Sequence, residues 1–272
     1  MAVEEHTGEI DGQPVFWRSA PAAGDRAPVL YVHGVPTSSD DWVPFLERTG
    51  GLAPDLLGFG RSGKGGQNDY SLEGIATFVE RFLDEVVPGG AERVRLVVHD
   101  WGSAALVFAQ RHPERIERLV IVNAVPLLPG YRWHRIARLW RTPFVGEMAM
   151  GLTLRPALAR ALRPAFAGPV PREFVRATYA CFDQGTQRAI LRLYRSAPEE
   201  LLAASGRALS SLSIPALVVW GARDPYISSR FGDAYAAELP AGEVVHVDDA
   251  GHWPWLDRPD LIDRIATFLD ES

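Results

Sequence analysis

Five short apolar runs, spaced along the chain and separated by other patterns, most constrain what this sequence can fold into. They cover residues 29–32, 94–98, 119–122, 216–220 and 244–247. Runs of four or five residues suit fully buried strands better than helices. Helical patterns lie between some of them and at the end of the chain, as at residues 72–87 and 259–269. Strands that alternate with helices predict an α/β fold, with a parallel sheet covered by helices on both faces.

Local signals define several elements. Ser71 is a candidate N-cap for the helix at residues 72–87, and Pro88-Gly89-Gly90 ends that helix. Asp11-Gly12, between two short extended runs, predicts a β-hairpin near the N-terminus. Residues 127–211 differ from the rest because they are helical throughout, rich in arginine, and without a strand signal. We expect this stretch to be a helical insertion that lies over the sheet.

Composition excludes several classes of protein. A chain of 272 residues with 47% hydrophobic residues can bury a stable core without disulfide bonds or structural metal ions. Cys181 is the only cysteine, which excludes an internal disulfide framework and a multi-cysteine zinc site. The net charge of −6 argues against nucleic acid or an anionic membrane as the main partner. Residues 1–8 do not resemble a signal peptide, and we expect no membrane span and a cytoplasmic location.

The segment from Val94 to Ser103 carries the strongest chemical signal. A buried strand is predicted to run into Asp100, and small residues such as Gly102 then open a helix. A nucleophile elbow has this form, because its reactive side chain sits on a sharp strand-to-helix turn that needs small neighbours. Aspartate takes the elbow position, and the chain has no Gly-x-Ser-x-Gly motif. The alternative is that Asp100 is a helix N-cap, a position that aspartate favours.

Polar residues follow three other predicted strands. The segment His33-Gly34-Val35-Pro36 follows residues 29–32, where a backbone amide could complete an oxyanion hole. Asp224 and His252 follow the last two strands, although Asp224 alone could be a turn residue before Pro225. Ligands of open α/β sheets bind at the edge where the carboxyl ends of the strands meet. We therefore expect Asp100, Asp224 and His252 to form one catalytic site.

With these segments together, the chain resembles the α/β-hydrolases, in the branch of epoxide hydrolases and haloalkane dehalogenases that uses an aspartate nucleophile. The resemblance rests on His33-Gly34-Val35-Pro36, residues 55–62, His99-Asp100-Trp101-Gly102-Ser103, residues 221–224 and Gly251-His252-Trp253. It implies a mostly parallel eight-stranded sheet in a core formed by residues 1–126 and 212–272. Residues 127–211 then correspond to the helical cap, or lid, of these enzymes.

The resemblance also implies roles for the site residues. Asp100 would attack saturated carbon to give an alkyl ester, and His252 would act as the base for its hydrolysis. Asp224 would orient the imidazole and stabilise its cation. Backbone N–H groups of Val35 and Trp101 would hold the oxyanion, with His33, Gly34 and Pro36 beside the substrate. The nearby Asp248 and Asp249 fit the family pattern of the acid less well than Asp224.

The leaving group divides this branch. Epoxide hydrolases resembling this chain use two cap tyrosines, and Tyr194 matches the second of them. The expected place of the first, residues 142–150, has no tyrosine, which leaves Tyr131 and Tyr179 as substitutes. Haloalkane dehalogenases bind the halide through the tryptophan after the nucleophile, here Trp101, and through a second donor. In one group of dehalogenases that donor is an asparagine, and this chain has Val35 at the corresponding position. We expect epoxide hydrolase-like activity. The alternatives are haloalkane dehalogenation, another hydrolysis such as that of an ester or lactone, and a non-catalytic small-molecule receptor.

Two other patterns have simpler interpretations. Gly58-Phe-Gly60-Arg-Ser-Gly63 matches a dinucleotide fingerprint, but no helix is predicted to follow it, which argues against nucleotide binding. The stripe of Arg132, Arg135, Arg138 and Arg141 predicts an amphipathic helix with a solvated face, or else a site for an anion or a partner. We expect a small apolar organic substrate and water as partners, without cofactor, metal, nucleic acid or membrane, and leave a homodimer open.

Overall fold

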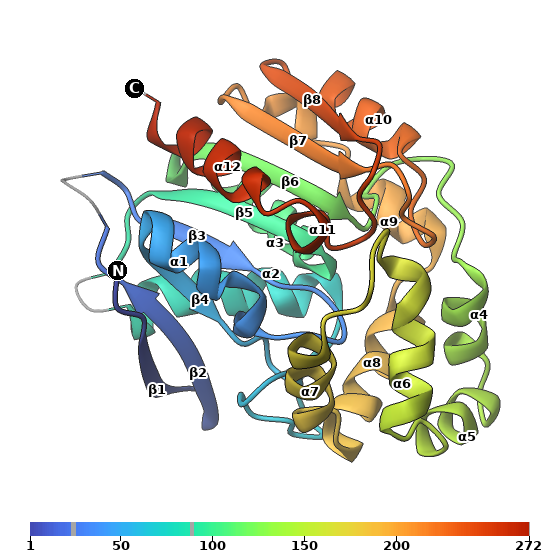
Figure 1. Cartoon of the computed structure of the whole chain (residues 1–272). Coiled ribbons are helices and arrows are strands. Elements are labelled where there is room, and N and C mark those ends of the chain that lie inside the picture. Colours follow the sequence, from blue (N-terminus) through green and yellow to red (C-terminus); the bar gives the residue numbers. More distant parts are fainter. Residues whose placement is uncertain (23–25, 88–89, 272) are drawn as a thin grey trace.

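One eight-stranded sheet organises the chain, as expected (Figure 1). The computed structural model describes residues 1–22, 26–87 and 90–271. The strands follow the order β1-β2-β4-β3-β5-β6-β7-β8; β2 pairs antiparallel with β1 and with β4, and all other pairs are parallel. The strands are β1 Glu4–Ile10, β2 Gln13–Ala20, β3 Val29–Val32, β4 Gly51–Pro54, β5 Val94–Asp100, β6 Ile116–Ala124, β7 Ala216–Gly221 and β8 Gly242–Val247.

All five apolar runs form strands, and most extend beyond their predicted ends. The predicted hairpin at Asp11-Gly12 joins β1 to β2, with Ile10 opposite Gln13. The strand β4 escaped prediction because its sequence, Gly-Leu-Ala-Pro, contains one large apolar residue between a glycine and a proline. Its buried place in the sheet comes from its neighbours β2 and β3 and is not encoded in a local pattern.

Helices cover both faces of the sheet, as the alternating pattern predicted. In Figure 1, α1 and α12 lie in front of the strands, and α2 and α3 lie behind them. The core helices are α1 Val43–Thr49, α2 Leu72–Arg81, α3 Ala105–Arg111, α10 Arg230–Glu238, α11 Pro254–Asp257 and α12 Asp260–Asp270.

The helix α2 shows how the sequence signals translate into structure. The Ser71 side chain accepts a hydrogen bond from the Gly74 N–H, so the predicted N-cap is confirmed. The α-helix ends at Arg81, earlier than predicted, and a π-helical turn, Phe82–Val86, completes the segment. Within the predicted stop signal, Pro88 and Gly89 lie outside the described residues.

Residues 127–211, here called the cap segment, contain helices and no strand; all of them are described. Its helices are α4 Arg135–Arg141, α5 Val145–Gly151, α6 Arg155–Leu162, α7 Arg172–Ala180, α8 Gln184–Ser196 and α9 Glu199–Ser205. Helices α4 to α8 lie together at one end of the molecule (Figure 1). The division into a core domain and a separate cap domain stays a prediction. No helix among the described residues is long and apolar enough to cross a membrane.

Two glycines allow the close packing at the end of β5. A side chain at Gly34 would collide with the Asp100 carboxylate, and one at Gly102 would collide with the backbone carbonyl of Val32. The backbone oxygen cannot rotate away as a flexible side chain could. Gly102 therefore sets how closely the turn after β5 approaches β3.

We predict that Gly102→Ala destabilises the fold. Forcing a methyl group into a filled space costs about 1–3 kcal/mol, so thermal unfolding followed by circular dichroism should occur several degrees lower. Gly151→Ala is the matched control, because a side chain there meets nothing within 4 Å. Equal unfolding temperatures for the two variants would contradict this account of the turn.

Candidate active site

Asp100 occupies a strained turn at the carboxyl end of β5. Its backbone has φ 49° and ψ −121°, a region that costs a residue with a side chain about 1–3 kcal/mol. Its side chain makes no capping hydrogen bond to the following 3₁₀ turn, Trp101–Ala104, so Asp100 does not serve as an N-cap. Instead, the Val35 N–H donates to Asp100 Oδ1 at 2.8 Å. The turn thus presents a buried carboxylate beside a backbone donor.

The structure brings the three predicted residues of the triad together. His252 Nδ1 donates to Asp224 Oδ2 at 2.7 Å, and His252 Nε2 lies 3.5 Å from Asp100 Oδ2. All three side chains are buried. The other oxygen of Asp224 accepts from the backbone N–H groups of Tyr226 and Ile227. The Asp224 carboxylate is therefore fixed, and the imidazole turns its second nitrogen toward Asp100.

The carboxylates control the protonation of the site. Burial alone would lower the pKa of His252, but the charges of Asp224 and Asp100 outweigh it and raise that pKa to about 10. Burial alone would likewise raise the pKa of Asp100, yet its contacts with His252 hold it below its usual value. At neutral pH the resting site is an imidazolium between two carboxylates.

Two supporting residues were not predicted. Asn123, at the end of β6, donates from Nδ2 to Asp224 Oδ2 at 2.7 Å and accepts from the Gly221 N–H at 2.8 Å. Its backbone φ is 38°, a conformation that asparagine tolerates better than most residues. A polar residue at the carboxyl end of a buried strand is the signal that could have revealed it. His99 Nε2 donates to the His252 carbonyl at 2.8 Å and so holds the loop that carries His252.

The loop after β3 contributes to the site unevenly. Val35 and Pro36 line the cavity above Asp100, whereas His33 and Gly34 are absent from its described lining. His33 is buried and holds the loop from behind: its Nε2 accepts from the Leu56 N–H at 2.9 Å, and its Nδ1 donates to the Gly34 carbonyl at 2.7 Å. The expected place of His33 beside the substrate is therefore not found, and the ring supports the backbone that presents Val35.

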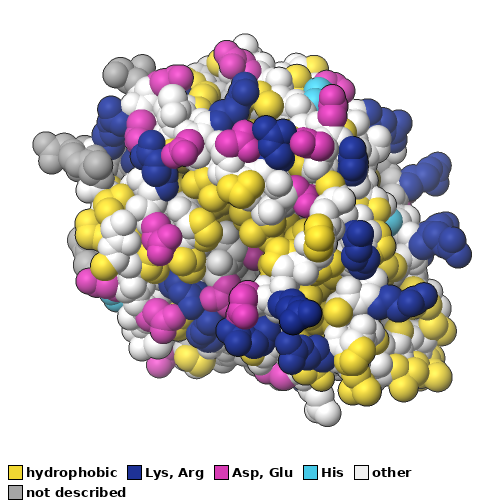
Figure 2. All heavy atoms as spheres, viewed as in Figure 1, with side chains coloured by type: hydrophobic (Ala, Val, Ile, Leu, Met, Phe, Trp, Pro, Cys, Tyr) yellow, Lys and Arg dark blue, Asp and Glu magenta, His cyan; other side chains and the backbone are white. Residues whose placement is uncertain are grey.

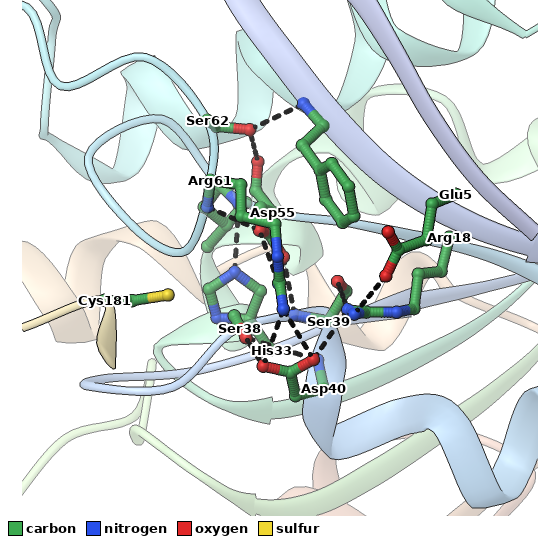
Figure 3. A network of polar contacts seen from close by, with 12 residues as sticks. Glu5, Arg18, His33, Ser38, Ser39, Asp40, Asp55, Arg61, Ser62 and Cys181 are labelled. Atoms are coloured by element: carbon green, nitrogen blue, oxygen red, sulfur yellow. Dashed lines mark hydrogen bonds and ion pairs between the residues drawn. The ribbon is translucent and has the colours of Figure 1, made fainter. Parts of the chain in front are cut away.

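A network of polar contacts fixes the same loop further back (Figure 3). The buried Asp55 accepts from the backbone N–H groups of Ser39 and Arg61, each at 2.7 Å. The Arg61 side chain also contacts Asp40, which pairs with Arg18. These contacts join the loop after β3 to the loop after β4, the segment that matched a dinucleotide fingerprint.

A cavity of about 250 Å³ lies over Asp100 and His252. Its wall is mostly apolar and aromatic, and the cap segment supplies much of it: Tyr131, Trp133, His134, Trp140, Leu158, Phe182 and Tyr194. No group of three or more His, Cys, Asp or Glu side chains among the described residues is placed to hold a metal ion. The cavity therefore suits a small apolar molecule that presents its reacting atom to Asp100.

Three tyrosines line this cavity with Asp100, and one of them, Tyr226, donates its hydroxyl to the Ala161 carbonyl at 3.2 Å. Tyr194 lies on α8, and burial followed by the charge of Asp100 raises the pKa of its hydroxyl well above 10. The same two causes raise the pKa of Tyr131, whose buried hydroxyl has no hydrogen-bond partner among the described residues. Tyr179, the other substitute considered, does not belong to the described cavity lining. Tyr194 and Tyr131 therefore place protonated phenols in the cavity that contains the carboxylate.

Trp101 lies beneath the cavity wall. Its indole is fully buried, stacks on Trp133 with ring centroids 5.3 Å apart, and meets the edge of Tyr194 at 5.0 Å. Its Nε1–H lies beside the Tyr194 hydroxyl but makes no hydrogen bond of regular geometry with a described residue. The N–H of Trp133 donates to the Ala197 carbonyl at 3.0 Å and so points to the protein. Neither indole therefore offers the cavity an open donor in this arrangement.

The fold and this buried site define a hydrolase of the α/β type. The sequence profile described as "alpha/beta hydrolase fold" matches residues 27–259, so the chain belongs to that family. It is similar to a haloalkane dehalogenase of Mesorhizobium japonicum, with 29% identity over 92% of this chain and 86% of the relative. It is as similar, at 29%, to a cis-3-alkyl-4-alkyloxetan-2-one decarboxylase of Shewanella oneidensis, over 92% of this chain and 84% of that one.

Solved structures agree with this assignment. The haloalkane dehalogenase DbeA from Bradyrhizobium elkani superposes with a TM-score of 0.85 and 26% identity, over 98% of each chain. The epoxide hydrolase CorEH shares the fold, with a TM-score of 0.82 and 22% identity over 98% of each chain. The chain is a hydrolase enzyme similar to haloalkane dehalogenases, and it shares the fold of the epoxide hydrolase CorEH.

We predict that Asp100→Asn lowers the pKa of His252. The substitution removes one of the two negative charges beside the imidazole, and an opposite charge at such a distance shifts a pKa by about 1–3. Titration of the histidine signals by NMR measures the change. Asp248→Asn, at an exposed carboxylate near His252 in sequence, is the control and should leave the value unchanged. The same pKa in both variants would contradict the coupling of Asp100 and His252.

Proposed function

We propose that this enzyme opens a small apolar epoxide to a diol through a covalent ester on Asp100. The observation that carries the proposal is the position of two of the three cavity tyrosines, Tyr194 and Tyr131, in one apolar cavity with Asp100. The hydroxyl of the third, Tyr226, already donates to the Ala161 carbonyl. An epoxide oxygen leaves as a strongly basic alkoxide, which a nearby O–H group stabilises as its charge develops. A halide is a weak base and gains much less from such a donor.

In the first step, an Asp100 oxygen attacks a ring carbon, and the bond from that carbon to the ring oxygen breaks. The electron pair stays on the ring oxygen, which takes a proton from a tyrosine hydroxyl. The tyrosinate left behind takes a proton from the His252 imidazolium, which leaves that imidazole neutral. The product is a hydroxyalkyl ester of Asp100. The carboxylate needs no base for this attack, because its pKa is held low and it is ionised at neutral pH.

In the second step, water attacks the ester carbonyl carbon while His252 removes a proton from it. The carbonyl oxygen becomes an oxyanion, and the Val35 N–H, which already contacts Asp100 Oδ1 at 2.8 Å, would stabilise it. The tetrahedral intermediate then collapses: the bond from its carbon to the diol oxygen breaks, and that oxygen takes a proton from the imidazolium. The carboxylic acid of Asp100 then ionises and returns its proton to His252. Asp224 stabilises the imidazolium through its 2.7 Å contact with Nδ1.

The charge state of His252 changes between the two steps. In the resting enzyme its pKa of about 10 keeps it protonated and unable to act as a base. Alkylation neutralises Asp100, so the imidazole loses one of the charges that raise its pKa. Epoxide opening consumes one proton at the alkoxide, and the imidazolium holds one proton to release. Halide departure consumes none, so the proton balance suits an epoxide.

Haloalkane dehalogenation is the second candidate. The dehalogenase relatives and the unpartnered Nε1–H of Trp101 favour it, since a small shift of Tyr194 would open that donor to a halide. Against it, Val35 has no side-chain donor and the Trp133 N–H is already bonded. A panel of styrene-type epoxides and bromoalkanes, with diol and bromide release measured side by side, separates the two reactions.

We predict that His252→Gln forms the ester but does not hydrolyse it. General-base catalysis contributes about 100- to 10,000-fold, so the adduct should accumulate while the first step continues. Intact-mass measurement after addition of the epoxide should show one added substrate mass, and peptide mapping should place it on Asp100. Normal turnover by this variant would contradict the role of His252, and absence of any adduct would favour a non-catalytic receptor.

We predict that Tyr194→Phe slows epoxide opening at least tenfold, about 1.4 kcal/mol of barrier. The phenyl ring keeps the packing on Trp101 but cannot donate a proton. Tyr131→Phe should slow the same step, because its hydroxyl lines the same cavity. Tyr179→Phe is the control outside the cavity lining. Wild-type rates of ester formation in both Tyr194→Phe and Tyr131→Phe would sink the epoxide proposal, and bromide release by the wild type would replace it with dehalogenation.

A further inference from the structure

Exposed apolar side chains gather on one part of the cap segment. Of the eight large hydrophobic side chains exposed among the described residues, six belong to this region, here called the apolar tip: Leu139, Phe144, Val145, Met148, Leu152 and Leu154. Phe144 is 83% exposed and Leu152 is 74% exposed. Figure 2 shows hydrophobic side chains together at the lower right end, where α5 lies in Figure 1. Apolar surface of this extent commonly marks a site of interaction.

The backbone holds Phe144 outward at a cost. The Val145 N–H donates to the Pro143 carbonyl at 2.8 Å, which makes Phe144 the central residue of a γ-turn with φ 65°. Such turns with positive φ are rare and strained. An exposed phenyl ring makes no contact with water that would offset this backbone strain. Burial of the ring by a binding partner would offset it.

Unpaired positive charge lies beside the apolar tip. Arg138 and Arg155 are the sequence neighbours of Leu139 and Leu154, and Arg135 lies one helical turn before Leu139. All three are exposed, and none forms an ion pair with a described residue. Arg132 and Arg160 are further exposed arginines of the cap segment without such a pair. The cap segment as a whole has thirteen arginines and five acidic residues, a net charge of +8, which leaves −14 for the rest of the chain. The net charge of −6, from which we expected no membrane partner, averages two regions of opposite sign.

We propose that the apolar tip and the arginines around it dock the cap segment on the surface of an anionic lipid bilayer. Apolar side chains would enter the region between headgroups and acyl chains, and the arginines would contact the anionic headgroups. A second copy of the chain fits this face less well. A two-fold symmetric contact places the same surface on both sides and so brings arginines against arginines.

The apolar tip is continuous with the wall of the cavity. Leu139 is 42% exposed and also lines the cavity over Asp100. Other residues of α4 and α5, such as Ile136 and Ala149, form the same wall. Docking would therefore place this wall at the bilayer, where apolar molecules concentrate. That consequence for substrate entry rests on the proposed function, whereas the docking itself does not.

Co-sedimentation of the purified full chain with vesicles tests the docking without any substrate. Vesicles of phosphatidylcholine with about 30% phosphatidylglycerol should bind the protein at low ionic strength. Phosphatidylcholine alone, or salt near 0.5 M, should weaken binding about tenfold or more, because salt screens the attraction between the arginines and the headgroups.

Variants separate the apolar and the charged contributions. Phe144→Ser with Leu152→Ser should lower the partition coefficient at least tenfold. Leu201→Ser is the matched control, since Leu201 is also exposed but lies on α9 outside the apolar tip. Arg135→Gln with Arg138→Gln should lower it about 25-fold, at about fivefold for each arginine near the surface. Arg93→Gln, at an exposed arginine outside the cap segment, should leave it unchanged. Circular dichroism should show that all variants keep the wild-type unfolding temperature.

Three results would overturn the proposal. The first is no binding to the anionic vesicles at low salt. The second is equal binding by the wild type and the Phe144/Leu152 variant. The third is size-exclusion chromatography in which the wild type is a dimer and that variant a monomer, because a second copy would then occupy the apolar tip. None of these results depends on whether the enzyme opens epoxides.

Discussion

One buried imidazole held between two carboxylates is the interaction on which the rest of this site depends. His252 would lose its charge in an apolar interior, but Asp224 and Asp100 keep it protonated. The free-energy cost of burying three charges is offset in part because each carboxylate also accepts hydrogen bonds from backbone N–H groups. Val35 donates to Asp100, and Tyr226 and Ile227 donate to Asp224. In the proposed reaction, alkylation of Asp100 would remove one of these charges, so His252 would become available as a base only after Asp100 has reacted.

The sheet supplies the rigidity that this arrangement needs. Asp100, Asn123 and Asp224 lie at or just beyond the carboxyl ends of three neighbouring parallel strands, β5, β6 and β7, so the register of the sheet sets their separation. Two of the three, Asp100 and Asn123, have positive φ. Strain of this kind persists only where surrounding contacts determine the backbone. His33 and Asp55 provide such contacts for the facing loop (Figure 3).

The sequence allowed prediction of the sheet and of where the triad residues lie, for a physical reason. Parallel strands end at one edge, so polar residues placed after apolar runs must meet there whatever the loops do. The place of Tyr131 in the cavity could not be predicted in this way, because it depends on the path of an irregular segment after β6. The role of His33 was also missed, since a histidine beside a catalytic loop looks the same in sequence whether it faces the cavity or the core.

The stripe of Arg132, Arg135, Arg138 and Arg141 shows the same limit of prediction from sequence. Periodicity placed Arg138 and Arg141 on one helix face, but only packing distinguishes them. Arg141 turns inward and donates to the carbonyl groups of Tyr194 and Ala197, which ties α4 to the helix that carries the proposed proton donor. Arg138 stays exposed beside the apolar tip. The same short helix thus contributes to the cavity wall through Leu139, to the exposed surface through Arg138, and to the position of α8 through Arg141.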